Sequence, residues 1–444
     1  MTDKAALLND FATRVVKAAS GGLLDKRPIE IRQVRTVAGP RAGALQVDAG
    51  LDAGRLLRVL SRDDCALLRQ FVPWNFAGHP AAFMAGRWVR VEAGWSPELA
   101  ESDIPLRALG PYPHGGGRWV LGKNEHGRTV AAGLNLDRTP HWLVSGATGA
   151  GKTVALRSAV CQLAADPHNR LVVVDGKRGA SFRGLAMAGM VGPVATRPDD
   201  WRAALVWAAS AMRTRYDDPG GPGRLVVVVD EVQEVILADP AAAEAVRRLV
   251  VLGRDAAVHC LLATQHPIVK ALGGPTVTRN LVGRLALRVA DYDASRVAVG
   301  GSTPRADHLL GRGDAYAVAP TACQRVQVAY TTAVDLEGVA GAPEWDAWPE
   351  VDAADLGTAP KGRPSKWPEP PEVGAAIAAA ADGQRGRPWL QQAIVSQGLP
   401  RPGCGRTDRL LHLGREVVGW LETNEWILTH DQAWAEQGVV CQSA

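Results

Sequence analysis

The sequence lacks several features that would assign it to a membrane, secreted or metal-cluster class. It has no run of about 18 apolar residues, so no transmembrane helix is predicted. The N-terminal segment contains acidic side chains and no long apolar stretch, which is unlike a secretory signal. The 6 cysteines are scattered without a CxxC pair, which argues against a disulfide framework or a zinc ribbon. We therefore expect a cytoplasmic protein with no integral membrane span.

Charge of either sign is not in large excess. The 50 Lys and Arg residues exceed the 46 Asp and Glu residues by a formal net charge of +4, which excludes a histone-like protein. A local basic patch stays possible, because the sum says nothing about distribution. Lysine is scarce beside arginine, so each Lys in a special context stands out. The 444 residues, 46% of them hydrophobic, predict two or three domains with buried cores.

Four segments differ in pattern along the chain. Residues 1–115 combine an amphipathic helix with strand-like alternation, which predicts a small α+β subdomain. Residues 116–335 alternate short, fully apolar strands with helices, which predicts a doubly wound α/β domain whose parallel sheet is covered on both faces. Residues 336–372 are rich in Pro, Ala, Gly and acidic residues and predict a semi-extended linker. Residues 373–444 suffice for a small independent domain.

The strongest motif is a P-loop, GATGAGKT, between the strand HWLVS and a helix that begins at Lys152. Glycines let backbone N–H groups wrap phosphates, and the helix N-terminus adds its positive dipole end. We expect Lys152 to reach the β- and γ-phosphates of ATP and Thr153 to ligate Mg²⁺. The predicted nucleotide-binding residues are Gly146, Ala147, Thr148, Gly149, Ala150, Gly151, Lys152 and Thr153.

Two further strands end in polar residues that suit nucleotide hydrolysis. The run RLVVVVDE is a Walker B element, in which Asp230 would hold Mg²⁺ directly or through water. Glu231 would polarise the attacking water as general base, and its presence favours hydrolysis over simple nucleotide binding. The strand LLAT is followed by Gln265, which is placed to sense the γ-phosphate. The alternative for Gln265 is that it satisfies a local backbone group.

Several phrases in fixed order resemble one family. They are HWLVSGATGAGKT, VVVVDEVQEVI, AVHCLLATQHP, GRLALRV, DYDASR and LLGRGDAY. Together they resemble the motor domain of the FtsK/SpoIIIE family of double-stranded DNA translocases, over about residues 119–330. The transmembrane helices and long linker of chromosome-segregating members are not seen here. The layout is therefore most similar to the actinomycete plasmid-transfer proteins of the TraB type.

The resemblance implies a RecA-like motor that assembles as a homo-hexamer around double-stranded DNA. A neighbouring subunit would then complete the ATP site with an arginine finger. Arg284 occupies the family's position for this role, and Arg254 and Arg296 are the other candidates. A solvated arginine or a structural ion pair is the alternative for each. The resemblance also suggests a site-supporting or inter-subunit role for Asp175 and Lys177. Candidates for pore contacts to phosphate are Lys270, Arg279 and Arg312.

The C-terminal segment has the pattern of a helix, a turn and a second helix, in the place where the family carries a winged-helix domain. Helix-turn-helix proteins insert the start of the recognition helix into the major groove. Arg406 and Arg409 are thus the candidates for reading bases or phosphates, with Arg401 beside them. The alternative is a three-helix oligomerisation or docking module with a solvated arginine face.

These observations predict an ATP-dependent double-stranded DNA translocase that serves conjugative transfer of plasmid or integrative-element DNA. One alternative is a translocase for chromosome segregation. An alternative of another class is an ATP-binding, DNA-binding regulator or replication protein without processive movement. A transfer protein also needs membrane-associated partners. Only the amphipathic helix within residues 1–20 is a candidate for peripheral membrane contact, and we expect it instead to pack on the motor.

Overall fold

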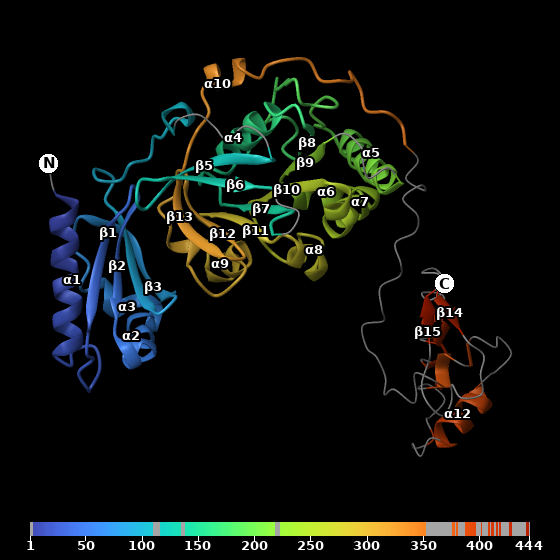
Figure 1. The fold of residues 1–444 in the computed structure, drawn as a ribbon. Helices are drawn as coiled ribbons and strands as arrows, with labels where there is room; N and C mark the ends of the chain where they lie inside the picture. Colours follow the sequence, from blue (N-terminus) through green and yellow to red (C-terminus); the bar gives the residue numbers. More distant parts are fainter. Residues whose placement is uncertain are drawn as a thin grey trace. The chain divides into compact units, whose positions relative to one another are not determined.

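The computed structural model describes most of the first 351 residues and short stretches beyond them. The described residues are 3–109, 116–134, 138–217, 223–351, 375–377, 379–380, 387–396, 401, 407–408, 410–412, 414–415, 417–418, 426–428 and 441–443. The chain forms two compact units, Met1–Asp355 and Leu356–Ala444 (Figure 1). Among the described residues, no helix is both long enough and apolar enough to cross a membrane.

The N-terminal part of the first unit is a four-stranded antiparallel sheet in the order β1-β2-β4-β3. Its elements are α1 (Lys4–Ser20), β1 (Gln33–Ala38), β2 (Ala42–Asp48), η1 (Gly50–Asp52), α2 (Ala53–Leu60), α3 (Arg62–Arg69), β3 (Phe76–Ala85) and β4 (Trp88–Trp95).

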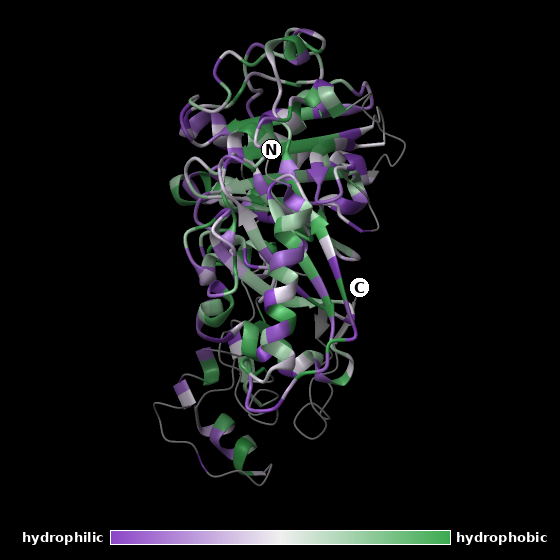
Figure 2. Cartoon of the chain, turned by 90° about the vertical axis from the view of Figure 1, so that its left-hand side faces the viewer, coloured by the Kyte–Doolittle hydropathy of each residue, from purple (hydrophilic) through white to green (hydrophobic). Residues whose placement is uncertain are grey.

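Helix α1 carries hydrophobic and hydrophilic residues along its length (Figure 2). It buries Leu8, Phe11 and Val15 in one core with strands of this sheet. Its apolar side is therefore covered by its own subdomain, which corrects the expectation that it packs on the motor.

The larger sheet has nine strands in the order β6-β5-β13-β12-β11-β7-β10-β9-β8. These strands are β5 (Arg118–Asn124), β6 (Thr129–Gly133), β7 (Trp142–Ser145), β8 (Asn169–Asp175), β9 (Arg224–Asp230), β10 (Val258–Thr264), β11 (Gly283–Leu287), β12 (Asp314–Ala319) and β13 (Ala322–Val328).

The sheet is mixed, which corrects the prediction of a parallel sheet. Strands β11, β7, β10, β9 and β8 pair in parallel, as the apolar strands between helices predicted. Strands β12, β13, β5 and β6 extend the sheet in antiparallel pairs. For β12 and β13 the reason is the length of the connection: Pro320 and Thr321 alone join them, and a parallel crossover needs a dozen residues or more.

Helices cover both faces of this sheet. Successive β11 residues face opposite sides: Leu285 and Leu287 pack in the core that contains α4, and Ala286 packs in the core that contains α9. The helical elements are η2 (Leu106–Leu109), α4 (Lys152–Ala164), α5 (Pro198–Asp217), α6 (Val232–Ala238), α7 (Pro240–Leu252), η3 (Gly253–Ala256), α8 (Pro275–Asn280), α9 (Tyr292–Val299), η4 (Ala306–His308) and α10 (Ala333–Glu337).

The chain beyond α10 packs on this α/β layer up to at least Trp348, although it falls in the segment expected to be linker. The Trp345 ring centroid lies 4.7 Å from that of Trp207 on α5, and the Trp348 centroid lies 5.9 Å from it. The Trp348 indole N–H also donates to the carbonyl of Pro193 at 3.1 Å. The aromatic residues of this segment thus anchor it.

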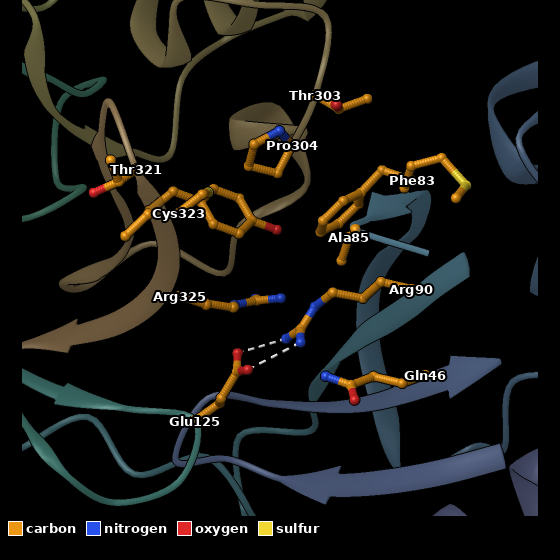
Figure 3. Close-up of a pocket in the computed structure, with 14 residues that line it drawn as sticks. Gln46, Phe83, Ala85, Arg90, Glu125, Thr303, Pro304, Thr321, Cys323 and Arg325 are labelled. Atoms are coloured by element: carbon orange, nitrogen blue, oxygen red, sulfur yellow. Dashed lines mark hydrogen bonds and ion pairs between the residues drawn. The ribbon is translucent and has the colours of Figure 1, made fainter. Parts of the chain in front are cut away.

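A buried network of charges joins the N-terminal sheet to the larger one. Arg90 on β4 makes a bidentate contact with Glu125, at 2.9 and 2.5 Å (Figure 3). Arg325 on β13 makes a bidentate contact with Asp314, at 2.9 and 2.6 Å, and a third bond to Glu92 on β4 at 3.0 Å. Burial alone would raise the pKa of Glu92, but Arg325 and Arg90 outweigh it and lower that pKa. Arg90 and Arg325 also line a cavity of about 490 Å³ between the two sheets.

The second unit is described in part. It contains α12 (Arg387–Ser396) and an antiparallel pair, β14 (Trp426–Leu428) with β15 (Cys441–Ser443). Its core includes Leu390 and Ile394 from α12, together with Leu410. The described residues do not identify a winged helix, so that part of the fold stays a prediction.

Candidate nucleotide site

The P-loop connects the central strand β7 to helix α4. Strand β7 pairs with β10 on one side and β11 on the other, so the loop leaves the sheet at the carboxyl edge of its parallel half. Gly149 and Gly151 adopt φ values of +77° and +108°, which glycine reaches without strain. A Cβ at Gly151 would lie 2.8 Å from the Gly313 nitrogen, because the Gly313 amide donates to the Ala150 carbonyl at 2.7 Å. The loop before β12 therefore packs directly against the P-loop.

The Walker B strand brings its acidic residues to the P-loop lysine. Strand β9 lies between β8 and β10 and is buried from Leu225 onward. The Lys152 ammonium donates to Asp230 Oδ1 at 2.9 Å and to Glu231 Oε1. Glu231 has φ +51° and ψ +56°, a left-handed conformation that is uncommon for a residue with a side chain and occurs often at functional sites.

Gln265, at the end of β10, links the two motifs. Its side-chain amide donates to Glu231 Oε1 at 2.6 Å, and its backbone N–H donates to Glu231 Oε2 at 3.1 Å. Its side-chain oxygen accepts from the Thr148 hydroxyl of the P-loop at 2.9 Å. The three strand ends singled out in the sequence thus meet at one edge of the sheet.

Other contacting residues were not singled out from the sequence. The Gln233 amide donates to Glu231 Oε2 at 2.6 Å and accepts from the Thr264 hydroxyl at 2.7 Å. The Ser181 hydroxyl donates to Asp230 Oδ2 at 2.6 Å. Gln233 lies two residues after the catalytic candidate on a short helix, a signal that could have found it. Ser181 lies six residues after the end of β8, and its spacing from the motifs does not indicate a role in the site.

Lys177, expected to have a supporting role, reaches the same acidic pair from the loop after β8. Its ammonium lies 2.9 Å from Glu231 Oε1 and 3.8 Å from Asp230 Oδ2. Burial alone would lower the pKa of Lys177, but Glu231 and Asp230 raise it. Burial alone would raise the pKa of Glu231, but hydrogen bonds from Lys152, Lys177 and Gln233 lower it to about 2. Both Lys177 and Glu231 are therefore charged at neutral pH.

The residues present suit a magnesium nucleotide. Among the described residues, no group of three or more His, Cys, Asp and Glu side chains could hold a metal by itself. Mg²⁺ typically takes one or two protein oxygens and completes its shell with phosphates and water. Thr153 and Asp230 could supply the protein oxygens and leave the other positions open. No described atom lies within 4 Å of a Cβ built at Gly149, so the space beside this P-loop glycine is open. Bound Mg²⁺ would neutralise developing charge on the phosphates.

Arg284 is held by groups of its own chain. Its guanidinium donates to the carbonyls of Val297 at 2.6 Å and Thr278 at 2.9 Å, which ties α9 and α8 to β11. Burial lowers its pKa. Of the other finger candidates, Arg254 is 3.7 Å from Asp255 and Arg296 is exposed.

The residues predicted to contact DNA are spread over the chain. Lys270, Arg279 and Arg312 are exposed. Arg401 donates to the side-chain oxygen of Gln391 on α12 at 3.0 Å. Arg406 and Arg409 lie outside the described residues.

Comparison with known proteins finds relatives of the P-loop region of this chain. Residues 118–218 match the FtsK/SpoIIIE family. The DNA translocase FtsK of Streptomyces avermitilis is 31% identical over 281 residues, which are 54% of this chain and 29% of the relative. The DNA translocase FtsK of Listeria monocytogenes is 29% identical over 254 residues, which are 50% of this chain and 33% of the relative. The chain thus spans about a third or less of these curated relatives.

A solved structure of the pCW3 conjugation coupling protein TcpA, in its monomer form with ATPgS, is 17% identical with a TM-score of 0.46. It covers 72% of this chain and 95% of its own. The matched region includes the P-loop, and the fold brings the Walker B residue Asp230 into contact with the P-loop lysine. This chain is a P-loop ATPase whose residues 118–218 are similar to the FtsK/SpoIIIE family.

Proposed function

We propose that this chain is an ATP-driven translocase of double-stranded DNA. The observation that carries the proposal is the FtsK/SpoIIIE match over the P-loop strand and helix, joined to relatives named DNA translocases at about 30% identity over half of the chain. The position of Glu231 beside the P-loop lysine supports hydrolysis as the source of energy, because a carboxylate there can accept a proton from an attacking water.

Each residue of the site has a proposed role. Lys152 binds the β- and γ-phosphates, while Thr153 and Asp230 hold Mg²⁺. Glu231 accepts a proton from the attacking water as general base. Gln265 senses the γ-phosphate, a role supported by its bonds to both Thr148 and Glu231. To bind phosphate, Lys152 exchanges its carboxylate partners for phosphate oxygens.

Assembly as a homo-hexamer with DNA in a central pore is part of the same proposal. Arg284 is the proposed finger that enters a neighbour's site, and that role requires it to release its bonds to Val297 and Thr278. Proposed DNA contacts are Lys270, Arg312, Arg401, Arg406 and Arg409.

Within the translocases we favour transfer of plasmid or integrative-element DNA, with membrane-associated partners, over chromosome segregation. The basis is the sequence resemblance to plasmid-transfer proteins. A mating assay with an element that encodes this chain separates the two: deletion of the gene should abolish DNA transfer and leave chromosome partition normal. Normal transfer combined with trapped chromosomes at division would support segregation instead.

The test of translocation begins with ATP hydrolysis by the full chain, with and without linear duplex DNA. Duplex DNA should raise kcat, and Lys152→Ala and Glu231→Ala should each remove the activity. Displacement of a third strand from a triplex-bearing duplex then reports movement itself. No stimulation by duplex would refute the translocase proposal and favour an ATP-binding regulator. Equal stimulation by single-stranded DNA would indicate a coupling protein that handles single strands.

The C-terminal unit needs a separate test. Deletion of residues 373–444 should remove preference for particular DNA sequences and keep basal ATP hydrolysis. Loss of basal hydrolysis in that truncated chain, with loss of its folded circular dichroism spectrum, would assign the unit a structural role instead.

A further inference from the structure

The loop that follows β8, residues 176–181, is organised by one buried carboxylate. Asp175 Oδ1 accepts the backbone N–H of Lys177 at 2.9 Å, and Asp175 Oδ2 accepts that of Ser181 at 2.8 Å. The Ser181 hydroxyl in turn donates to Asp230 at 2.6 Å. The loop after β8 thus contacts the acidic end of the Walker B strand β9, and it approaches from the neighbouring strand β8 and not from the P-loop.

Two lysines contact the Glu231 carboxylate, and their side chains differ in solvent exposure. The Lys152 side chain is 4% exposed and starts helix α4, where it serves the phosphates. The Lys177 side chain is 30% exposed and extends from the loop, with its ammonium 2.9 Å from Glu231 Oε1. Lys177 can therefore leave the carboxylate by rotating its stem toward solvent.

The Glu231 carboxylate has more donors than it can accept together with a water molecule. Oε1 receives Lys152, Lys177 and the Gln265 side chain, and Oε2 receives Gln233 and the Gln265 backbone. A carboxylate offers about four lone-pair sites. A general base must accept a hydrogen bond from the water whose proton it takes. If Lys152 moves to the phosphates, four donors to Glu231 remain. They fill all the acceptor sites, so one more donor must leave before water can bind.

We propose that Lys177 is a positioning residue for hydrolysis: it holds the Glu231 carboxylate and competes with the attacking water for Oε1. This inference rests on the proposed role of Glu231 as general base. Release of Lys177 opens the acceptor that water needs, so the loop after β8 sets how often the site is ready for hydrolysis.

The test is steady-state ATP hydrolysis by the full chain without DNA. Lys177→Met removes the ammonium at similar length and should raise kcat about fivefold, the factor that one partly exposed ion pair supports, with KM for ATP unchanged. Lys177→Arg keeps the cation and should stay near the wild-type rate. The matched control is Arg178→Met, which removes a positive charge from an exposed neighbour on the same loop and should change neither parameter.

Several outcomes overturn the inference. A lower kcat or a raised KM in Lys177→Met would mean that Lys177 serves the phosphates or the reaction directly. An unchanged kcat with an unchanged thermal midpoint would mean that the contact has no kinetic role. Should Lys177→Met not fold, Lys177→Gln is held to the same criteria.

The role of Glu231 is tested separately with Glu231→Gln in the wild-type and Lys177→Met backgrounds. Wild-type activity in Glu231→Gln would refute the general-base proposal. Inactivity there, with no rise in Lys177→Met alone, would refute only the Lys177 inference.

Discussion

The buried charge network between the two sheets makes a quantitative prediction for Arg325→Met. Arg325 bonds both Glu92 and Asp314, and all three side chains are almost fully buried. Methionine fills similar space and leaves two carboxylates without this cation. Removal of one partner of a buried ion pair costs about 3–5 kcal/mol. We expect the free energy of unfolding to fall by about that amount at pH 7.5.

The loss should depend on pH. In the wild type, Arg325 and Arg90 lower the pKa of Glu92, so their contribution is present above the carboxyl's ordinary pKa and is lost as pH falls. In the variant, Glu92 keeps Arg90 and loses Arg325, so its pKa should rise above the wild-type value and the penalty should grow as pH rises. The difference in stability between the two proteins should therefore be largest at pH 7 to 8 and shrink toward pH 4.

Urea unfolding followed by circular dichroism, at several pH values, measures this difference. Arg87→Met is the matched control, because Arg87 is 70% exposed and lies 3.8 Å from Asp48, a surface pair worth about 1 kcal/mol at most. A change below about 1 kcal/mol for Arg325→Met, or a loss that does not vary with pH, would refute the reasoning.

Two further predictions concern other buried groups. Burial lowers the pKa of His141 to about 3 and that of His259 to about 4, so both are neutral in the fold. Stability from these residues is complete above the ordinary histidine pKa and is lost as pH falls below it, so the thermal midpoint should drop between pH 7 and pH 5; a flat profile there would contradict this. Gly176→Ala should lower kcat for ATP more than tenfold, because a Cβ would lie 2.6 Å from the Asp230 carbonyl oxygen and 2.9 Å from that of Glu231. Gly54→Ala on α2, where no described atom lies within 4 Å of the new Cβ, is its control, and equal activity of the two variants would show that the close approach is unimportant.

Local sequence determined the core of the nucleotide site. The glycine spacing of the P-loop, the apolar run before Asp230 and the strand before Gln265 each specify a strand and the polar group that follows it. Parallel strands end at the same edge of a sheet, so these groups were expected to meet, and Lys152, Glu231 and Gln265 do. The fully apolar strands likewise predicted the five parallel strands and the helices on both faces.

Tertiary structure alone decided which distant groups become partners. Arg325 and Glu92 are 233 residues apart, and Ser181 and Asp230 are 49 apart. Such pairs depend on strand order and register, which the periodicity of a single strand does not encode. The same holds for the antiparallel half of the sheet, for the carbonyl partners of Arg284, and for the donors that crowd Glu231. Sequence by itself determined the reacting groups, because their motifs are local; the fold decided what restrains them, because those contacts join segments far apart in the chain.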